Sequence, residues 1–337
     1  MFKAFVKIAV LLSLTASMAF GYQAIRLNVS EGTYKERNDA FNGILEVDLE
    51  DAGFTPKDIH PKIEYYYKLF YGTKLLKDGK PNPQFKTDYV GNLDNLGFIT
   101  ISNEEWMREL LMKEPKLGSF APLNYLIYKK KSEDKTYVGT LTPQAMLDIA
   151  EIKDAGVRAA FTEKIDALSD ATDEGMGGEV EYVEIDKLPA KTLIEWEIPF
   201  DRGEDVLDAK FDFMEKFEKA FEAEEYIIAG KRDFAEYWVD NDLENDKYDA
   251  YWVYSLCHFT FSYTVFNVWE HPELGASAPC SMYMYLDKDS STLKVGMPSV
   301  DNWAVFGKIT DPKRLQFIKD MDSKIKEIMT SLGAKEI

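Results

Sequence analysis

The chain has 337 residues, of which 45% are hydrophobic and 14% aromatic, and this composition excludes a disordered protein. Its formal net charge of −19 argues against nucleic acid as a partner, because nucleic acids bind surfaces with clustered Lys and Arg. An excess of acid also favours solubility and repels anionic surfaces. The length favours two domains over a single hydrophobic core.

The chain begins MFKAFVKIAVLLSLTASMAFG, which has the pattern of a secretory signal peptide. Lys3 and Lys7 give a basic start, an apolar run follows, and Ala19 and Gly21 offer a small-residue cleavage site. The apolar run is shorter than the ~20 residues that a membrane-spanning helix needs. We therefore expect residues 1–21 to be removed. The mature protein should be periplasmic or secreted, with no stable membrane insertion.

Two segments of the chain repeat each other. Residues 114–143 read EPKLGSFAPLNYLIYKKKSEDKTYVGTLTP, and residues 271–300 read HPELGASAPCSMYMYLDKDSSTLKVGMPSV. With a constant shift of 157 they share nine identities in thirty positions without a gap. Self-similarity at this spacing predicts two copies of one domain rather than a solenoid, whose repeats are far shorter.

A segment rich in glycine and acid, SDATDEGMGGE at residues 169–179, lies between the copies and is typical of a linker. The sequence therefore predicts a first domain over residues 22–170, a linker over 171–180 and a second domain over 181–337.

Each copy is expected to run strand, helix, about four strands, helix. The alternating segments YQAIRLNV and KTLIEWEIPF predict the opening strands, and KIEYYYKLFYG, GFITIS and YDAYWVYSLCHFTFSYTVFNVW read as further strands. Phe213, Phe217 and Phe221 recur at helical spacing, and Asp311-Pro312 is typical of the start of a last helix. This order predicts an α+β protein made of two tandem β-α-β4-α domains, each an antiparallel sheet with helices packed on one face.

The shared turn LGSFAP or LGASAP, the aromatic-aliphatic strand after it, the VG strand end and the long last helix resemble the domain-of-unknown-function 302 family. The resemblance covers residues 97–168 and 250–334 best. It implies the β-α-β4-α arrangement of the TATA-binding-protein-like fold class, here in tandem. It implies no catalytic residues, because the family has no assigned activity.

Three soft side chains alternate in APCSMYMYL, namely Cys280, Met282 and Met284. Alternate residues of a strand share a face, and the equivalent positions of the first copy hold leucine, tyrosine and isoleucine. These residues therefore favour a packed core face in both copies. The alternative is a soft-metal site, since thioether and thiolate ligands suit Cu(I).

The same alternation, applied to LCHFTFSYTV, predicts that His258, Thr260 and Ser262 share a polar strand face. Tyr283 and Tyr285 should extend this face on the neighbouring strand. Polar groups on an aromatic floor are typical of a ligand site or an interface. The alternative is that the two copies pack together through this face.

Cys257 and Cys280 both fall on apolar faces by this alternation, in a chain expected to reach an oxidising compartment. We therefore expect a structural Cys257–Cys280 disulfide in the second domain.

These patterns favour a non-enzymatic ligand-binding or accessory protein of the periplasm, whose partner is a small molecule or a periplasmic protein. No cofactor or metal is expected on this hypothesis, and the sequence names no catalytic residue. The alternative is a periplasmic redox or copper-handling protein that uses Cys257, Cys280 and nearby methionines.

Overall fold

The computed structural model describes residues 21–337, so the predicted signal peptide lies outside the described residues except for Gly21. Elements of the first half are β1 (Tyr22–Glu31), α1 (Tyr34–Gly43), a π turn (Ile44–Asp48), α2 (Leu49–Asp51), β2 (Thr55–His60), α3 (Ile63–Tyr71), β3 (Leu93–Ser102), α4 (Glu104–Lys113), a 3-10 turn (Pro115–Phe120), β4 (Leu123–Lys130), β5 (Lys135–Leu141), α5 (Pro143–Ile149), α6 (Ala155–Met176) and β6 (Glu179–Ile185).

The second half repeats this order. Its elements are β7 (Leu193–Pro199), α7 (Val206–Glu222), β8 (Tyr226–Asp233), α8 (Phe234–Asp240), β9 (Tyr248–His258), α9 (Phe259–Tyr263), a π turn (Thr264–Val268), a 3-10 turn (Pro272–Ser277), β10 (Cys280–Asp287), β11 (Thr292–Pro298), α10 (Asp301–Phe306), α11 (Pro312–Ser331) and β12 (Lys335–Glu336).

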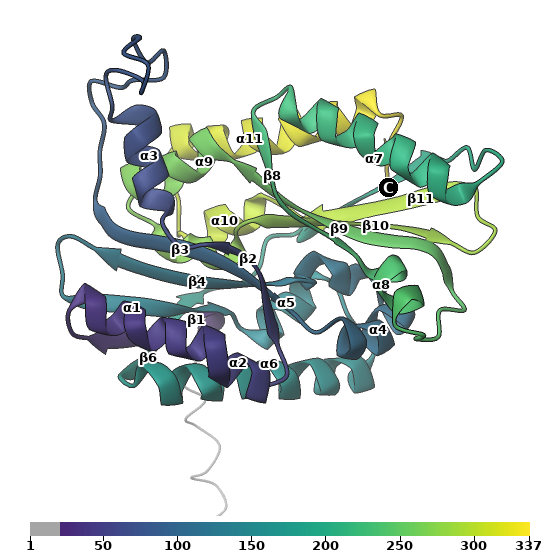
Figure 1. Ribbon diagram of the computed structural model, residues 1–337, viewed down its shortest axis with the longest axis horizontal. Helices are drawn as coiled ribbons and strands as arrows, with labels where there is room; N and C mark the ends of the chain where they lie inside the picture. Colours follow the sequence, from purple (N-terminus) through teal and green to yellow (C-terminus); the bar gives the residue numbers. More distant parts are fainter. Residues whose placement is uncertain (1–20) are drawn as a thin grey trace, which may run out of the picture.

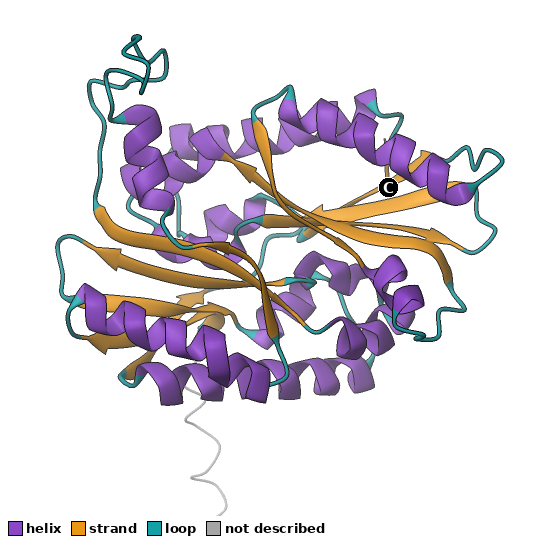
Figure 2. Ribbon diagram, viewed as in Figure 1, coloured by secondary structure: helices purple, strands orange, loops and turns teal. Residues whose placement is uncertain are grey.

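The two sheets have the same strand order. The first runs β2-β3-β4-β5-β1-β6 and the second runs β8-β9-β10-β11-β7-β12, with every neighbouring pair antiparallel. The repeated segments also occupy like positions, because each forms a 3-10 turn followed by the two central strands of its sheet. The predicted α+β fold with two similar domains is confirmed (Figure 2).

Long helices cover the outer face of each sheet, α1 and α6 on the first and α7 and α11 on the second (Figure 1). Phe217 of α7, for example, stacks on Tyr254 of β9 with ring centroids 4.7 Å apart. The inner faces of the sheets point toward each other. These inner faces, with the two 3-10 turns between them, form the contact surface of the domains, which we call the seam.

The last helix begins as its sequence predicts. The side chain of Asp311 accepts hydrogen bonds from the backbone N–H groups of Lys313 and Arg314, at 3.0 and 2.9 Å, and Pro312 takes the first helical position. Its buried residues Ile318 and Ile325 are two turns apart and face the sheet. Among the residues that the structure describes, no helix is long and apolar enough to cross a bilayer.

The predicted linker is wrong over most of its length. Helix α6 continues to Met176, because its last turns bind the opening strand. Asp173 pairs with Arg26 and accepts a hydrogen bond from Asn28 Nδ2 at 3.0 Å. Strand β6 then joins the first sheet, so the connection between the two sheets falls at residues 186–192.

The run KIEYYYKLFYG is also not a strand, although its aromatic residues favour one by propensity. It forms α3, whose buried Tyr67 and Tyr71 are four residues apart and so lie on one helical face. That face packs on Phe259 and Tyr263 of the second domain, with ring centroids 4.6 to 5.9 Å apart. Tertiary packing therefore overrides local preference here.

Candidate functional site

Tyrosine hydroxyl groups of the second domain bind the backbone of the first across the seam. Tyr248 donates to the carbonyl of Leu111, and Tyr251 donates to the carbonyl of Pro115, both at 2.6 Å. Burial is the main cause that raises the pKa of both tyrosines, so each hydroxyl keeps its proton and stays a donor.

Tyrosine hydroxyl groups of the first domain also make hydrogen bonds to the second domain. Tyr67 of α3 donates to Ser262 Oγ at 2.8 Å, and the hydroxyl of Tyr71 lies 2.9 Å from Thr260 Oγ1. Thr260 and Ser262, two of the predicted ligand-binding residues, therefore already use their hydroxyl groups in contacts between domains.

These two residues do not extend β9, which corrects the predicted face. Strand β9 ends at His258, and the next five residues form α9. His258 is the N-cap of that helix, since its Nδ1 accepts the backbone N–H of Phe261 at 3.3 Å. Its ring packs edge-on to Tyr226, with centroids 5.0 Å apart, and burial lowers its pKa. The structure thus separates His258 from Tyr283 and Tyr285 rather than joining them on one face.

Tyr283 and Tyr285 lie on the inner face of the second sheet. Tyr283 is 1% exposed, and its hydroxyl donates to Glu195 Oε1 at 3.1 Å. Glu195 also pairs with Lys116 of the first domain at 2.5 Å. Tyr285 stacks on Tyr251, with ring centroids 5.9 Å apart. The structure places both tyrosines within the packed seam, and whether they bind a ligand stays a prediction.

Met282 and Met284 are fully buried on the opposite, helix-covered face, beside Tyr254 and Trp252 of β9. Phe213 and Phe217 of α7 pack on these two aromatic rings, with centroids 6.4 and 4.7 Å apart. The alternating methionine stripe is therefore core, as its apolar counterparts in the first copy indicated. Within residues 21–337, no three His, Cys, Asp or Glu side chains are grouped so as to hold a metal ion.

The two cysteines are free thiols, and the predicted disulfide is not formed in this structure. Cys280 pairs in register with Leu256, so Cys257, the next residue of β9, points to the other face of the sheet. The Sγ of Cys257 lies 3.9 Å from Ser262 Oγ, whereas that of Cys280 lies 3.9 Å from the carbonyl of Ser277. Alternation within each strand predicts that both cysteines lie on apolar faces, but it does not show how the two strands are aligned, and the alignment places the cysteines on opposite faces of the sheet.

We expect thiol titration of unfolded, non-reduced protein to give two free thiols per chain. In the folded protein, burial raises the pKa of Cys257 to about 11 and that of Cys280 to about 12. Both should therefore react at least about a hundredfold more slowly with a thiol reagent at neutral pH than an exposed cysteine, because the thiolate is the nucleophile. If the titration finds no free thiol in the unfolded chain, the predicted Cys257–Cys280 disulfide is restored.

An enclosed cavity of about 20 Å³ lies in the seam, which is room for a water molecule. Both domains line it, through Ser119, Phe120, Asn124, Leu141, Ile149, Ser277, Cys280, Ser281, Pro298, Ser299, Asn302, Trp303 and Phe306. Asn124 and Ser281 occupy equivalent positions in the two copies, 157 residues apart. The cavity therefore lies where the two inner sheet faces meet.

Five buried polar atoms of this lining have no hydrogen-bond partner, and they are Ser119 Oγ, Asn124 Oδ1, Ser277 Oγ, Ser281 Oγ and Asn302 Oδ1. Their other groups are well bound. Asn124 Nδ2 donates to the carbonyl of Pro279 at 2.9 Å, and Asn302 Nδ2 donates to those of Thr192 and Ser299, both at 2.8 Å. Buried polar atoms almost always have a partner, so this group indicates a bound water or ligand.

The cavity can bind but has little means of acid–base chemistry. Hydroxyl and amide groups donate and accept hydrogen bonds, and among the described residues none that lines the cavity is an acid, a histidine, a lysine or an arginine. The one titratable lining group, Cys280, keeps its proton because burial raises its pKa to about 12. The arrangement favours a small, uncharged ligand that both donates and accepts hydrogen bonds.

Sequence reasoning missed this cavity because its residues come from turns, strands and helices of both domains. One signal was present: the equivalent positions Asn124 and Ser281 are both polar, although the four residues that follow each of them are apolar or aromatic. A polar pair at equivalent positions of a repeat indicates a shared, buried environment.

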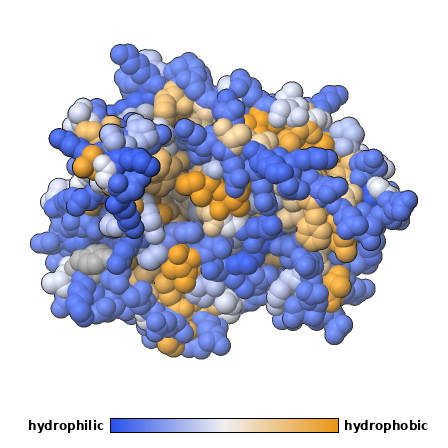
Figure 3. Space-filling view, turned by 45° about the horizontal axis from the view of Figure 1, so that its top comes forward, coloured by the Kyte–Doolittle hydropathy of each residue, from blue (hydrophilic) through white to orange (hydrophobic). Residues whose placement is uncertain are grey.

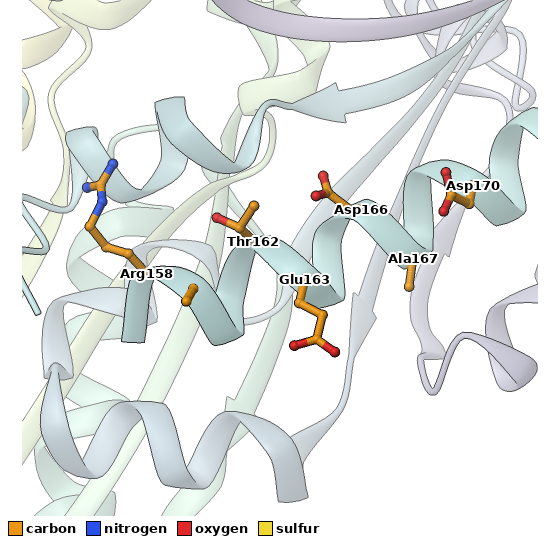
Figure 4. A pocket seen from close by; sticks show the side chains of 7 residues that line it. Arg158, Thr162, Glu163, Asp166, Ala167 and Asp170 are labelled. Atoms are coloured by element: carbon orange, nitrogen blue, oxygen red, sulfur yellow. The ribbon is translucent and has the colours of Figure 1, made fainter. Parts of the chain in front are cut away.

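A second hollow follows the exposed side of α6 and is lined by that helix alone, through Arg158, Ala159, Thr162, Glu163, Asp166, Ala167 and Asp170. Thr162 and Asp166 point to one side of the helix and Glu163 to the other, so the carboxylates diverge (Figure 4). An open helix surface with no facing wall cannot enclose a ligand, and we do not assign it a site.

Comparison with known proteins finds a family model and a solved structure that are similar to part of the chain. Residues 92–174 match the model of "Domain of unknown function DUF302", which spans β3 to α6. A solved structure, an uncharacterized conserved DUF302 protein from Bacillus stearothermophilus, is 16% identical over 40% of this chain and 95% of its own, with a TM-score of 0.32. None of the curated proteins compared with the chain matches it. Residues 92–174 are therefore similar to the DUF302 domain, and the second half of the chain repeats the strand order of the first.

Proposed function

We propose that this is an exported, non-enzymatic binding protein that holds a small uncharged polar ligand between its two domains. The five unpartnered polar atoms of the seam cavity carry this proposal. Export rests on the signal pattern of the first 21 residues.

Both the chemistry and the position of the cavity support a binding role. Its polar groups come from strands, turns and helix α10, which the packed seam holds in place within each domain, so they are ordered before a ligand arrives. Its present volume suits water, and a larger ligand would enter only if the domains moved apart slightly. Ligand binding would then be coupled to the closure of the two domains.

Replacement of Ser281 or Ser119 by alanine tests whether the cavity is occupied or empty. If a ligand or water satisfies the hydroxyl groups, we expect each variant to lose about 1 kcal/mol of stability and, for a ligand, its copurification. If nothing binds there, removal of an unpartnered buried hydroxyl should be neutral or stabilising, which would contradict the proposal.

The measurements are native mass spectrometry of protein purified from the periplasm, and thermal unfolding of the two variants. Ser169→Ala is the matched control, because Ser169 is also buried but donates to the carbonyl of Ile165 within its own helix, at 3.0 Å. A copurified mass that is lost in Ser281→Ala and kept in Ser169→Ala is the expected result.

A further inference from the structure

The segment of residues 62–86, which includes α3 and the loop after it, gathers exposed apolar side chains. We call it the arm. Six large apolar residues are at least 37% exposed within twelve positions, and they are Tyr65, Tyr66, Leu69, Phe70, Leu75 and Leu76. The arm stands at one end of the molecule, and its loop rises beyond the helices around it (Figure 1). The visible surface as a whole is mostly hydrophilic, with apolar side chains in separate patches (Figure 3).

Helix α3 is apolar over more than half of its circumference, and the rest of the chain covers only part of that surface. Tyr67 and Tyr71 pack on α9, as described above. At about 100° per residue, Tyr66 and Phe70 lie beside this buried stripe and Tyr65 and Leu69 lie beyond it. Phe70 still touches Phe259 with ring centroids 5.3 Å apart, although 44% of it remains exposed. The open side of α3 is thus a continuation of an apolar contact surface.

The loop after α3 is held in one shape, with two leucines near its tip. Asn82 Nδ2 donates to the carbonyls of Phe70 and Thr73, at 2.7 and 2.8 Å. Leu75 forms a bridge with Pro81, and the backbone N–H of Leu76 donates to the carbonyl of Lys80 at 2.8 Å. These bonds fix the loop before it meets a partner, so docking would cost little additional ordering.

The arm is basic, in contrast to the rest of the chain. It carries six lysines and two acids, Glu64 and Asp78, so its formal net charge is +4. Since the whole chain has a formal net charge of −19, the residues outside the arm sum to −23. Five of the lysines are exposed, and they are Lys62, Lys68, Lys74, Lys77 and Lys80. Lysines flank both leucines of the loop. The arm is therefore a local surface that attracts anions, although the chain as a whole is acidic.

We propose that the arm docks on the surface of an anionic lipid bilayer. Exposed leucines next to lysines match the layers of such a surface, because the apolar groups can enter the acyl boundary while the ammonium groups reach the phosphates. Tyrosine also favours the boundary between headgroups and acyl chains. Since most charges beyond about 8 Å are screened at physiological salt, the acidic body need not prevent contact by a projecting arm.

A second copy of this chain is a less suitable occupant. Two arms facing each other would bring together two surfaces of +4, and like charges destabilise such a contact. The proposal is independent of the seam cavity, because none of the arm residues lines it.

Sedimentation with vesicles tests the proposal on the purified protein. The probes are phosphatidylcholine vesicles with about one-third phosphatidylglycerol, and phosphatidylcholine vesicles alone. We expect binding to the anionic vesicles only, with a decrease between about 0.1 and 0.5 M salt. Lys74→Glu/Lys77→Glu should weaken binding at least about tenfold, since each lysine near the surface contributes roughly fivefold.

Leu75→Ser/Leu76→Ser should also weaken binding at least about tenfold, because these leucines would leave the acyl boundary. Leu207→Ser/Phe211→Ser is its matched control, since these two α7 residues are 50% and 51% exposed, against 56% and 44% for the two leucines. Unchanged circular dichroism and melting temperature would show that each variant is folded.

Binding that is lost in both arm variants and kept in the control supports the proposal. Absence of wild-type binding to anionic vesicles, or equal binding by the arm variants and the control, overturns it. Capture of an acidic protein by the arm without vesicle binding would assign the surface to a protein partner and would also overturn it.

Discussion

We expect Tyr283→Ala to lower the free energy of unfolding by about 3–5 kcal/mol, the cost of truncating a fully buried aromatic side chain. Tyr283 is 1% exposed and lies in the seam against Gly118 of the other domain. Its removal would leave a cavity and leave Glu195 without one of its two partners. Urea unfolding followed by circular dichroism measures the loss.

Two further variants show how much of that loss comes from the Tyr283 hydroxyl group and how much from burial of the ring. Tyr283→Phe keeps the ring and removes only the hydroxyl, so it should cost about 1.5 kcal/mol. Tyr182→Ala, on the edge strand β6, is the control for an aromatic residue that is 41% exposed, and it should cost well under half as much as Tyr283→Ala. A Tyr283→Ala protein of unchanged stability would contradict the packed seam and would restore the hypothesis of an open ligand-binding face.

The sequence predicts the fold well where two copies can be compared. The strands Cys280–Asp287 and Leu123–Lys130 share an alternation, so a residue that is ambiguous in one copy is explained by its counterpart in the other. Met282 alone suggests a metal ligand, whereas its equivalent Tyr125 indicates a core position. Both are buried below 2% exposure. Duplication thus acts as an internal control on the interpretation of each copy.

The same reasoning fails where aromatic residues occur on every side. In LCHFTFSYTV the alternate apolar residues also fit a helix, because Phe261 and Val265 are four apart, and both are buried. Nothing in the segment marks His258 as a helix N-cap, since histidine is not among the common capping residues. The end of β9 is decided by the contact of α9 with α3, which lies almost two hundred residues earlier in the chain.

The candidate site was harder to predict than the fold because it exists only after the domains pack together. Ser119 lies in the 3-10 turn of the first copy, and Asn302 lies in a helix of the second. Each is unremarkable in its own segment. Their unpartnered atoms meet because the 3-10 turn of each copy enters the other domain, and this exchange cannot be read from either repeat alone.

The shared LG turn is the element that makes this exchange possible, and it gives the second large effect. We expect Gly118→Ala to destabilise the protein by about 2–3 kcal/mol, as overpacking of a tight contact does. A Cβ on Gly118 would lie 2.5 Å from the Cβ of Tyr283 and still closer to the hydroxyl of Tyr251. Both neighbours are fixed in the central strands of the second sheet, so the domains would have to separate slightly.

Gly275 occupies the equivalent position of the second copy and should behave alike. Its Cβ would lie 2.6 Å from Phe98 Cε1 and 2.8 Å from a methyl carbon of Leu126. Leu126 is itself the counterpart of Tyr283, so each glycine meets the same position of the opposite domain. We expect Gly275→Ala to cost somewhat less, about 1–2 kcal/mol, because the ends of these side chains can move aside.

Gly43→Ala is the control for both variants, because Gly43 has helical backbone angles and no atom lies within 4 Å of the added Cβ. It should be neutral or stabilising by about 0.5–1 kcal/mol, since alanine favours a helix more than glycine does. If Gly118→Ala and Gly275→Ala match this control in thermal unfolding, the domains do not close on each other's LG turns, and the seam cavity is not enclosed. If both lower the melting temperature while Gly43→Ala does not, the glycines of the repeated motif are required by the contact between domains rather than by the turn itself.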